Sequence, residues 1–401
     1  MENNKTPKIR FKGFTDPWEQ RKLGDIVDKY EDPVETPHNG YYRLGIRSHA
    51  KGTFHSFVEK GHELETAKMH RVAANNFIVN ITFGWEHAVA ITDENDDGKL
   101  VSHRFPQYSF HEGMVPQFFK YVIADEDFRH WLWLASPGGA GRNRVLKLDE
   151  MLNYEVIFPS KVEQLKIGNY FKNLDNLITL HQRKYNKLLN VKKSMLEKMF
   201  PKNGSNIPEI RFKGFTDPWE QRKLGDIVGI YDGVHQTPNY QNSGVMFLSV
   251  ENIATLKSSK FISEEDFKRD YKVFPQENDI LMTRIGDVGT TNVITDNGLK
   301  AFYVSLALLK YKSTDPYFLS NAIQSDYVQK GLANRTLKTA IPMKINKDEI
   351  GKVSVMLPVS ATEQQQIGTY FRNLDNLITL HQRELEKLQN IKKSMLEKMF
   401  V

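Results

Sequence analysis

The stretch IGNYFKNLDNLITLHQRKYNKLLNVKKSMLEKMF at residues 167–200 returns as IGTYFRNLDNLITLHQRELEKLQNIKKSMLEKMF at residues 367–400, with 27 of 34 positions identical. In both copies, apolar side chains and one histidine recur in steps of four and three residues, the heptad spacing of a coiled-coil seam. The two seams are Ile167, Phe171, Leu174, Ile178, His181, Tyr185, Leu188, Val191, Met195 and Met199, and Ile367, Phe371, Leu374, Ile378, His381, Leu385, Leu388, Ile391, Met395 and Met399. Each copy therefore predicts a helix of about 50 Å. Its seam needs a partner, and the nearest candidate is the other copy, packed antiparallel.

A second repeated segment indicates that the whole chain is a duplication. IRFKGFTDPWEQRKLGDIV occurs at residues 9–27 and recurs unchanged at residues 210–228. The inserts that follow, residues 28–155 and 229–355, share only a skeleton. Uniform drift after a duplication would spread the differences evenly. Here the repeated segments, which we call the frames, are nearly identical, whereas the inserts differ. This contrast indicates that the two frames bind the same kind of partner, while the two inserts bind two different ligands. Gene conversion of the frames is the alternative that the sequence leaves open.

The composition is that of a globular protein. The 401 residues allow two or three domains, with 40% hydrophobic and 26% charged residues. No run approaches the roughly 18 apolar residues of a membrane helix, and the absence of cysteine excludes disulfides and thiolate sites, so a cytoplasmic location is expected. A net charge of +6 favours an anionic partner. The first insert, however, holds 14 basic and 19 acidic residues, which counts against DNA binding.

The sequence contains no recognisable catalytic motif. Gly98-Lys99 and Gly351-Lys352 lack the Ser or Thr of a phosphate-binding loop, and Asp315-Pro316-Tyr317 is one proline short of an adenine methyltransferase tetrapeptide. His181 and His381 could share a metal ion, but two imidazoles without carboxylate support are a weak ligand set. Packed seam histidines are the favoured interpretation. We therefore predict a non-catalytic chain without a metal site.

Basic and amide side chains gather near turns and glycine-rich loops in both inserts. Arginine and lysine can pair with guanine edges, and asparagine and glutamine with adenine. A single surface arginine more often pairs with a carboxylate, but the recurrence in both inserts makes DNA contact an equally good interpretation. The candidates are Arg43, Arg47, His49, Lys51, Arg142, Asn143 and Arg144 in the first insert, and His235, Tyr240, Gln241, Arg284, Thr291, Asn292, Arg335 and Lys338 in the second.

This organisation resembles the specificity subunit of a type I restriction–modification enzyme. One feature is the Phe-Thr-Asp-Pro-Trp-Glu lead, which contains Trp18 and Trp219; another is the Glu-Gln pair at residues 163–164 and 363–364, ahead of each helix. The string DGVHQTPNY at residues 232–240 is similar to a loop common in such subunits. The first insert keeps only Thr36-Pro37 of that loop, so contacts carried over to its opening strand have weaker support.

The resemblance implies an α+β fold: two pseudo-repeated mixed α/β target recognition domains separated by two long antiparallel helices that form a coiled coil. Each domain would read one half of a bipartite, asymmetric target in double-stranded DNA. The helices would set the spacing and dock two methyltransferase subunits, and two restriction/translocase subunits would complete the complex. No cofactor is expected on this chain, since S-adenosylmethionine, ATP and Mg would bind the partners. The candidate docking residues are Trp18, Trp219, Met195, Met199, Met395 and Met399.

The predicted segments are a lead at residues 1–27, a recognition domain at 28–158, a spacer helix at 159–202, a second lead at 203–228, a second domain at 229–357 and a second helix at 358–401. Two other functions remain open. A stand-alone DNA-binding regulator would bind its site without any enzyme, and a coiled-coil adaptor would join two proteins without touching DNA.

Overall fold

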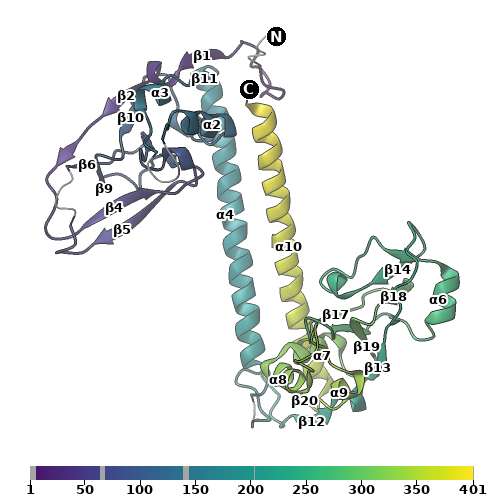
Figure 1. Cartoon of the computed structure of the whole chain (residues 1–401). Coiled ribbons are helices and arrows are strands. Elements are labelled where there is room, and N and C mark those ends of the chain that lie inside the picture. Colours follow the sequence, from purple (N-terminus) through teal and green to yellow (C-terminus); the bar gives the residue numbers. More distant parts are fainter. Residues whose placement is uncertain (1–5, 64–67, 139–143, 203, 401) are drawn as a thin grey trace. The chain divides into compact units, whose positions relative to one another are not determined.

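The computed structural model describes residues 6–63, 68–138, 144–202 and 204–400, and the chain divides into two compact units (Figure 1). Unit 1 comprises Met1–Leu180 and Glu384–Val401, and unit 2 comprises His181–Arg383. The two long helices are α4 (Lys161–Lys198) and α10 (Ala361–Met399). Each unit therefore contains one insert, the lead that precedes it, and a part of both long helices.

In unit 1 the lead strand β1 (Glu19–Lys22) pairs antiparallel with β11 (Glu155–Phe158), so the lead closes onto the segment just before α4. The insert forms a four-stranded sheet in the order β2-β10-β7-β8 and a five-stranded sheet in the order β3-β6-β9-β4-β5. Its strands are β2 (Val27–Tyr30), β3 (Pro33–Val34), β4 (Tyr41–Ile46), β5 (Thr53–Val58), β6 (Met69–Arg71), β7 (Phe77–Val79), β8 (Val89–Ile91), β9 (Leu100–Ser102) and β10 (Gln107–Phe110). The helices of the lead and the insert in this unit are η1 (Leu23–Asp25), η2 (Gly84–Glu86), α1 (Pro116–Val122), α2 (Glu126–Leu134) and α3 (Leu148–Leu152).

Unit 2 repeats this plan with a different second sheet. Strand β12 (Glu220–Lys223) pairs antiparallel with β20 (Ser354–Leu357). The insert forms a four-stranded sheet in the order β13-β19-β16-β17 and a three-stranded sheet in the order β15-β14-β18. Its strands are β13 (Gly229–Asp232), β14 (Val245–Leu248), β15 (Phe261–Ile262), β16 (Ile280–Thr283), β17 (Thr291–Val293), β18 (Lys300–Phe302) and β19 (Leu306–Lys310). The helices of the lead and the insert in this unit are α5 (Leu224–Ile227), η3 (Val250–Asn252), α6 (Glu264–Asp270), α7 (Pro316–Gln324), α8 (Asp326–Arg335) and α9 (Lys347–Gly351).

The four-stranded sheet is the part that the two inserts share. Its strands occupy the same order in both units, whereas the second sheet has five strands in unit 1 and three in unit 2. This shared sheet corresponds to the weak sequence similarity between the two inserts. The mixed α/β character of both domains confirms the predicted fold class.

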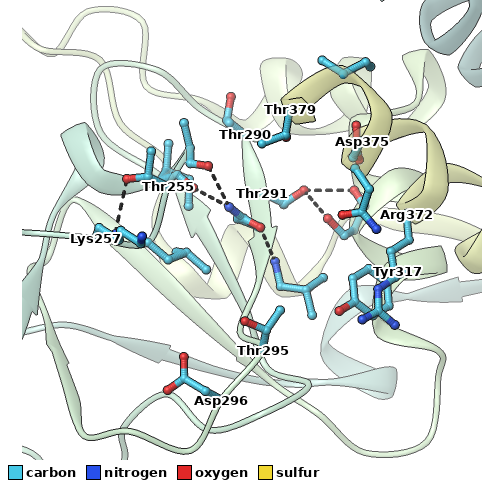
Figure 2. Close-up of a pocket in the computed structure, with 18 of the residues that line it drawn as sticks. Thr255, Lys257, Thr290, Thr291, Thr295, Asp296, Tyr317, Arg372, Asp375 and Thr379 are labelled. Atoms are coloured by element: carbon cyan, nitrogen blue, oxygen red, sulfur yellow. Dashed lines mark hydrogen bonds between the residues drawn. The ribbon is translucent and has the colours of Figure 1, made fainter. Parts of the chain in front are cut away.

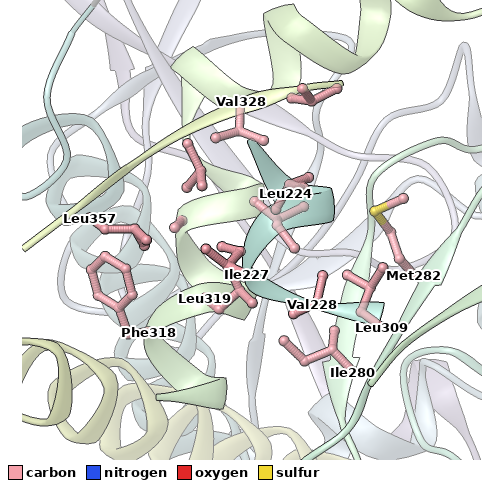
Figure 3. Close-up of a cluster of buried hydrophobic side chains, with 14 of the residues drawn as sticks. Leu224, Ile227, Val228, Ile280, Met282, Leu309, Phe318, Leu319, Val328 and Leu357 are labelled. Carbon is pink, nitrogen blue, oxygen red and sulfur yellow. The ribbon is translucent and has the colours of Figure 1, made fainter. Parts of the chain in front are cut away.

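The lead segment of unit 2 belongs to the core of its domain. Leu224 and Val228 pack in one cluster with Ile280 of β16 and Phe318 of α7, and all four are buried (Figure 3). Helix α7 starts sharply because Asp315 caps it, with the carboxylate accepting the Phe318 N–H at 2.8 Å. The insert therefore folds onto the lead rather than beside it.

The long helices begin a few residues before the repeated segment. Helix α4 starts at Lys161, where the Ser160 carbonyl accepts the N–H groups of Glu163 and Gln164 at 3.0 and 2.9 Å. The Glu-Gln pairs therefore lie in the first helical turn, not ahead of the helices as the sequence suggested, and α4 spans a shorter range than the predicted 159–202. All the predicted seam positions of α4 and α10 are buried or half-buried.

Within each unit the helices run antiparallel. In unit 1, Phe171 lies 5.8 Å from Phe400 between ring centroids, and Asp175 pairs with Lys392 at 2.6 Å. The corresponding contacts in unit 2 join Phe200 to Phe371 at 5.8 Å and Lys192 to Asp375 at 2.7 Å. In these contacts the residue number on α10 decreases as the residue number on α4 increases, as antiparallel helices require. The near-identical helices therefore make the same contacts twice, and the coiled-coil prediction is confirmed.

The seam histidines contact each other in unit 2. The Nδ1 atoms of His181 and His381 lie 3.0 Å apart, and both rings are half-buried. At this distance one imidazole donates the hydrogen bond and the other accepts it, so the pair is compatible with at most one charged ring. The contact agrees with the interpretation of packed seam histidines.

We expect the helix pairing to weaken in mild acid. Burial and the neighbouring His181 and Lys184 lower the pKa of His381 below its ordinary value of 6.5. The unfolded chain then binds a proton at higher pH than the folded chain, so this contribution to stability is lost as pH falls through about 6.5. Thermal unfolding at pH 7.5 and 5.5 measures the effect, with His381→Gln as the reference. An equal drop in Tm for the variant would contradict the assignment to this pair.

Candidate nucleic-acid interface

Three loops of the second domain meet around the buried side chain of Arg284, which is 5% exposed. Its Nε donates to the backbone oxygen of Ile345 at 3.1 Å, and its Nη1 pairs with the carboxylate of Asp232. The backbone oxygen of Arg284 accepts the Ile345 N–H at 3.0 Å. The structure therefore corrects the predicted role of Arg284, because its guanidinium joins the loops and is not free to contact DNA.

The first of these loops leaves β13 through Gly233. A Cβ at this position would lie 2.4 Å from the backbone oxygen of Phe302, so only glycine allows so close an approach. The loop then presents three of the predicted DNA-contacting residues to solvent, namely His235, Tyr240 and Gln241. The Tyr240 ring is 45% exposed and lies 5.5 Å from the Nζ of Lys260. These residues offer a polar and aromatic surface beside a cation.

The other two predicted residues on the loops of this domain are also exposed. Arg335 lies at the end of α8, and its Nη1 lies 3.4 Å from a carboxylate oxygen of Glu349. Lys338 follows in the next loop. Both remain candidates for contact with an anionic ligand, although Arg335 shares its charge with Glu349.

A groove of about 740 Å³ lies between the second domain and α10 within unit 2. In Figure 2, Arg372 and Thr379 come from α10, while Thr290 and Thr295 flank strand β17. The lining includes five cations and two carboxylates: Lys192, Lys257, Lys300, Arg372, Arg383, Asp296 and Asp375.

Three of the groove cations are available to a ligand. Lys192 pairs with Asp375, and Lys300 pairs with Asp296, where its hydrogen bond lowers the pKa of that carboxyl. The other three are exposed and make no ion pair within the described part of the chain; they are Lys257, Arg372 and Arg383. The Arg372 guanidinium lies 4.6 Å from the centroid of the Tyr317 ring. The groove can therefore attract a polyanion such as a phosphate backbone.

Two predicted DNA contacts in this groove are committed to the domain itself. Thr291 is 8% exposed, and its hydroxyl lies within hydrogen-bonding distance of Ser320 and of the Gln324 amide. The Asn292 amide donates to the backbone oxygen of Ile253 at 2.8 Å. The structure corrects both assignments: these side chains hold β17 against α7 and against the loop at residues 253–257.

In the first domain the hairpin β4–β5 carries four predicted contacts together. Arg43 lies on β4, and Arg47, His49 and Lys51 lie at the end of β4 and in the turn, all exposed. Arg47 lies 5.3 Å from the centroid of the Phe54 ring on β5. This concentration of positive charge on one hairpin weakens the objection raised by the negative balance of the insert.

Aromatic side chains accompany these cations. Tyr42 and Phe57 are 55% and 54% exposed, and their ring centroids lie 5.1 Å apart. Phe54 lies across Gly45, where a Cβ would approach the ring to 2.3 Å. Sequence reasoning noted Tyr42 beside these cations but missed Phe54 and Phe57, which lie three positions apart on β5 and therefore follow no period-two pattern.

The remaining predictions for the first domain lie elsewhere. Arg144 is half-buried, and its guanidinium lies 4.6 Å from the Trp133 ring centroid. Arg142 and Asn143 lie outside the described residues.

The predicted docking residues lie mainly in the cores. Trp18 and Trp219 are 2% and 3% exposed, and Met199 and Met399 are each 3% exposed. Met195 and Met395 are half-buried and pack against the same clusters. The four buried side chains stabilise the junctions between helix ends and domains, which corrects their assignment as surfaces for a partner, whereas the docking role of Met195 and Met395 stays a prediction.

Within residues 6–63, 68–138, 144–202 and 204–400 there is no cluster of three or more His, Asp or Glu side chains that could hold a metal ion. The same residues include no helix with the length and apolar character needed to cross a membrane.

Comparison with known families bears on the second repeat directly. Residues 216–390 match the family described as the type I restriction modification DNA specificity domain. This segment is a type I DNA specificity domain. The match confirms the resemblance carried by the lead, the Glu-Gln pair and the loop at residues 232–240. The matched segment begins in the second lead and ends in α10, so it includes the Arg284 loops and every residue that lines the groove except Lys192.

Two relatives extend the likeness. The chain is 23% identical over 259 residues to the type I restriction enzyme MjaVIII specificity subunit of Methanocaldococcus jannaschii, covering 61% of this chain and 60% of that protein. The crystal structure of the type I restriction–modification S subunit from M. genitalium matches with a TM-score of 0.65 at 15% identity, covering 99% of both chains. The second likeness shows that the fold of that subunit extends over both repeats, specificity domain included.

Proposed function

We propose that this chain is the DNA-recognition subunit of a type I restriction–modification complex. Each domain reads one half of a bipartite, asymmetric target, and the helices set the spacing between the half-sites. The observation that carries the proposal is the contrast between the units. The reciprocal pairs Asp175–Lys392 and Lys192–Asp375 repeat the frame, whereas the second sheets and the exposed loops differ. Equal frames suit two copies of one partner, and unequal loops suit two unlike half-sites.

Charge on the domains supports binding to a duplex. The first domain gathers Arg43, Arg47 and Lys51 on one hairpin, and the groove of the second offers Lys257, Arg372 and Arg383. Lysine and arginine contacts to phosphates fix the register of a protein on DNA, while side chains on loops read the base edges. We therefore assign Arg372 and Arg383 to phosphate contacts and the loop at residues 232–241 to base contacts.

The helices carry exposed leucines that suit a protein partner. Leu177 and Leu180 are 43% and 45% exposed in unit 1, and Leu377 and Leu380 are 45% and 52% exposed in unit 2. We assign each pair to the docking of one methyltransferase subunit. The double variant Leu177→Glu with Leu180→Glu should co-purify with one methyltransferase subunit instead of two, whereas Asn176→Glu should retain both. Retention of both copies by the double variant would remove these leucines from the interface.

In this proposal the partners perform the chemistry. The two methyltransferase subunits bind S-adenosylmethionine and methylate adenine, and the two restriction/translocase subunits use ATP and Mg. This chain recognises the target sequence and sets the spacing between the half-sites, and no catalytic step is assigned to its residues. The cytoplasmic location expected from the sequence remains a prediction.

Methylome sequencing with and without this gene tests the function. We expect a bipartite adenine-methylation target to disappear when the gene is removed and to return when it is restored. An unchanged methylome in a strain that expresses the partner subunits would contradict the proposal. Near-normal binding to one DNA site by the isolated chain, with no effect on methylation, would favour a stand-alone regulator.

A further inference from the structure

The loop between α8 and α9 of the second domain carries an exposed apolar tip. Ile341 is 101% exposed, and Leu337 and Met343 are 46% and 44% exposed. Exposed apolar residues are common singly, but three on one loop form a patch. The loop also includes Pro342, so the tip itself is Ile341-Pro342-Met343.

The base of this loop is firmly held. Leu337 N–H donates to the Lys344 carbonyl at 2.8 Å, and Gly286 N–H donates to the Met343 carbonyl at 2.8 Å. Ile345 is fully buried and is bonded to Arg284 through both its N–H and its carbonyl group. The tip therefore projects from a well-anchored base, and binding of a ligand requires little further loss of conformational entropy in this loop.

Positive charge surrounds the apolar tip. Residues 335–347 include four cations and no acidic residue; the cations are Arg335, Lys338, Lys344 and Lys347. Arg335 pairs with Glu349, whereas the three lysines are exposed and make no ion pair among the residues that the structure describes. An apolar centre with a cationic rim fits duplex DNA, where phosphates flank the stacked bases and the thymine methyl groups.

The segment that precedes α3 in the first domain differs in sequence from the segment that precedes α9. Counting back from the residues that precede α3 and α9, Lys147 and Asn346, aligns the buried Leu146 with the buried Ile345. The same count aligns the sequence Arg-Asn-Arg at residues 142–144 with Ile-Pro-Met at residues 341–343. The buried position is thus apolar in both repeats, whereas the aligned three-residue sequence is rich in arginine in the first repeat and apolar in the second.

We infer that Ile341-Pro342-Met343 makes the apolar contact of the second domain with the base pairs of its half-site. The inference rests on the proposed function and adds how the second domain recognises the bases of its half-site. The apolar side chain meets either a thymine methyl group or a base step that it partly unstacks. Arg284 positions the tip through Ile345, and Lys338 contacts phosphate beside it. By contrast, the aligned sequence of the first insert, Arg142-Asn143-Arg144, consists of hydrogen-bond donors.

Binding of the assembled methyltransferase complex to target DNA tests the inference, with Ile341→Ser as the variant. We expect a loss of affinity for the target of about tenfold, of the order of one lost base-pair contact, and little change for unrelated DNA. Val359→Ser is the matched control, because Val359 is 62% exposed and lies just after β20. Lys338→Ala should instead weaken binding to all sequences alike and reduce the salt dependence by about one phosphate contact.

Two modified duplexes distinguish the forms of the contact. Loss of affinity on replacing one thymine of the second half-site by deoxyuridine, in the wild type but not in Ile341→Ser, indicates a methyl contact. A rise in 2-aminopurine fluorescence that requires Ile341 indicates insertion at a base step. If Ile341→Ser binds and discriminates like Val359→Ser, the inference is wrong. If the wild-type complex shows no preference for its methylated target sequence, the proposed function fails instead.

Discussion

Replacing Arg211 with alanine is expected to destabilise the second unit by about 3–5 kcal/mol, because it removes the charged partner of a buried carboxylate, which then keeps, of the described residues, only the indole N–H of Trp219 at 3.4 Å. Glu363 lies in the first turn of α10 and is 1% exposed. Arg211 in the lead binds it through two hydrogen bonds, Nε to Oε1 at 2.6 Å and Nη2 to Oε2 at 2.8 Å. The hydrogen bond to Glu363 also raises the pKa of Arg211 above its usual value. This pair fixes the lead to the start of the helix.

The free energy of unfolding of the full chain, measured in denaturant, gives the result. Arg222→Ala is the control, because Arg222 reaches Glu220 only at 3.8 Å and both side chains are at least half exposed. Such a surface pair contributes about 0–1 kcal/mol. Equal losses for Arg211→Ala and Arg222→Ala would show that the buried pair does not hold the junction. Arg10 and Glu163 form the same bidentate pair in unit 1, so Arg10→Ala should have a similar effect there.

Replacing Phe200 with alanine should cost about 3–5 kcal/mol of stability in the second unit, the usual range for removing a buried phenylalanine. Its ring is 4% exposed and lies between Trp219, Phe318 and Phe371, with centroids at 6.0, 5.6 and 5.8 Å. These three residues come from the lead, the insert and α10. Loss of the ring therefore opens a cavity where all three parts of the unit meet.

Phe400 offers an internal comparison. It contacts Trp18, Phe118 and Phe171 in the same way in unit 1, but it is half-buried. Phe400→Ala should therefore cost less than Phe200→Ala. The exposed Leu189→Ala should change stability by no more than about 0.5 kcal/mol. Denaturant unfolding of the three variants ranks their losses in the free energy of unfolding. A loss for Phe400→Ala as large as that for Phe200→Ala would contradict the burial argument.

The repeated frames could be predicted from the sequence because their physics is local or periodic. The seam from Ile167 to Met199 follows from steps of four and three residues, and the structure buries it as that pattern requires. The reciprocity of the contacts follows from the identity of the frames. The order of the strands does not, because it depends on pairings such as that of β10 with β7, whose residues lie about thirty positions apart in the chain.

The candidate site was less predictable because a residue type does not reveal where its side chain lies. Arg284 and Arg47 look alike in the sequence, yet one is buried against Asp232 and Ile345 and the other is exposed beside Phe54. The repeated motif around Trp18 predicts a docking residue, but the side chain is 2% exposed. It is repeated because it fills the core beside Phe118, which is a packing requirement that recurs in both units.

Exchange of the inserts tests the central claim most directly. In the variant chain, a second copy of residues 28–158 replaces residues 229–357. This chain keeps both leads and both helices but has two copies of the first recognition domain. Methylome sequencing of a strain that depends on this chain should reveal a symmetric target, with the half-site of the first domain repeated in inverted orientation. Continued methylation of the original asymmetric target, or no methylation by a chain that still co-purifies with two methyltransferase subunits, would contradict the account.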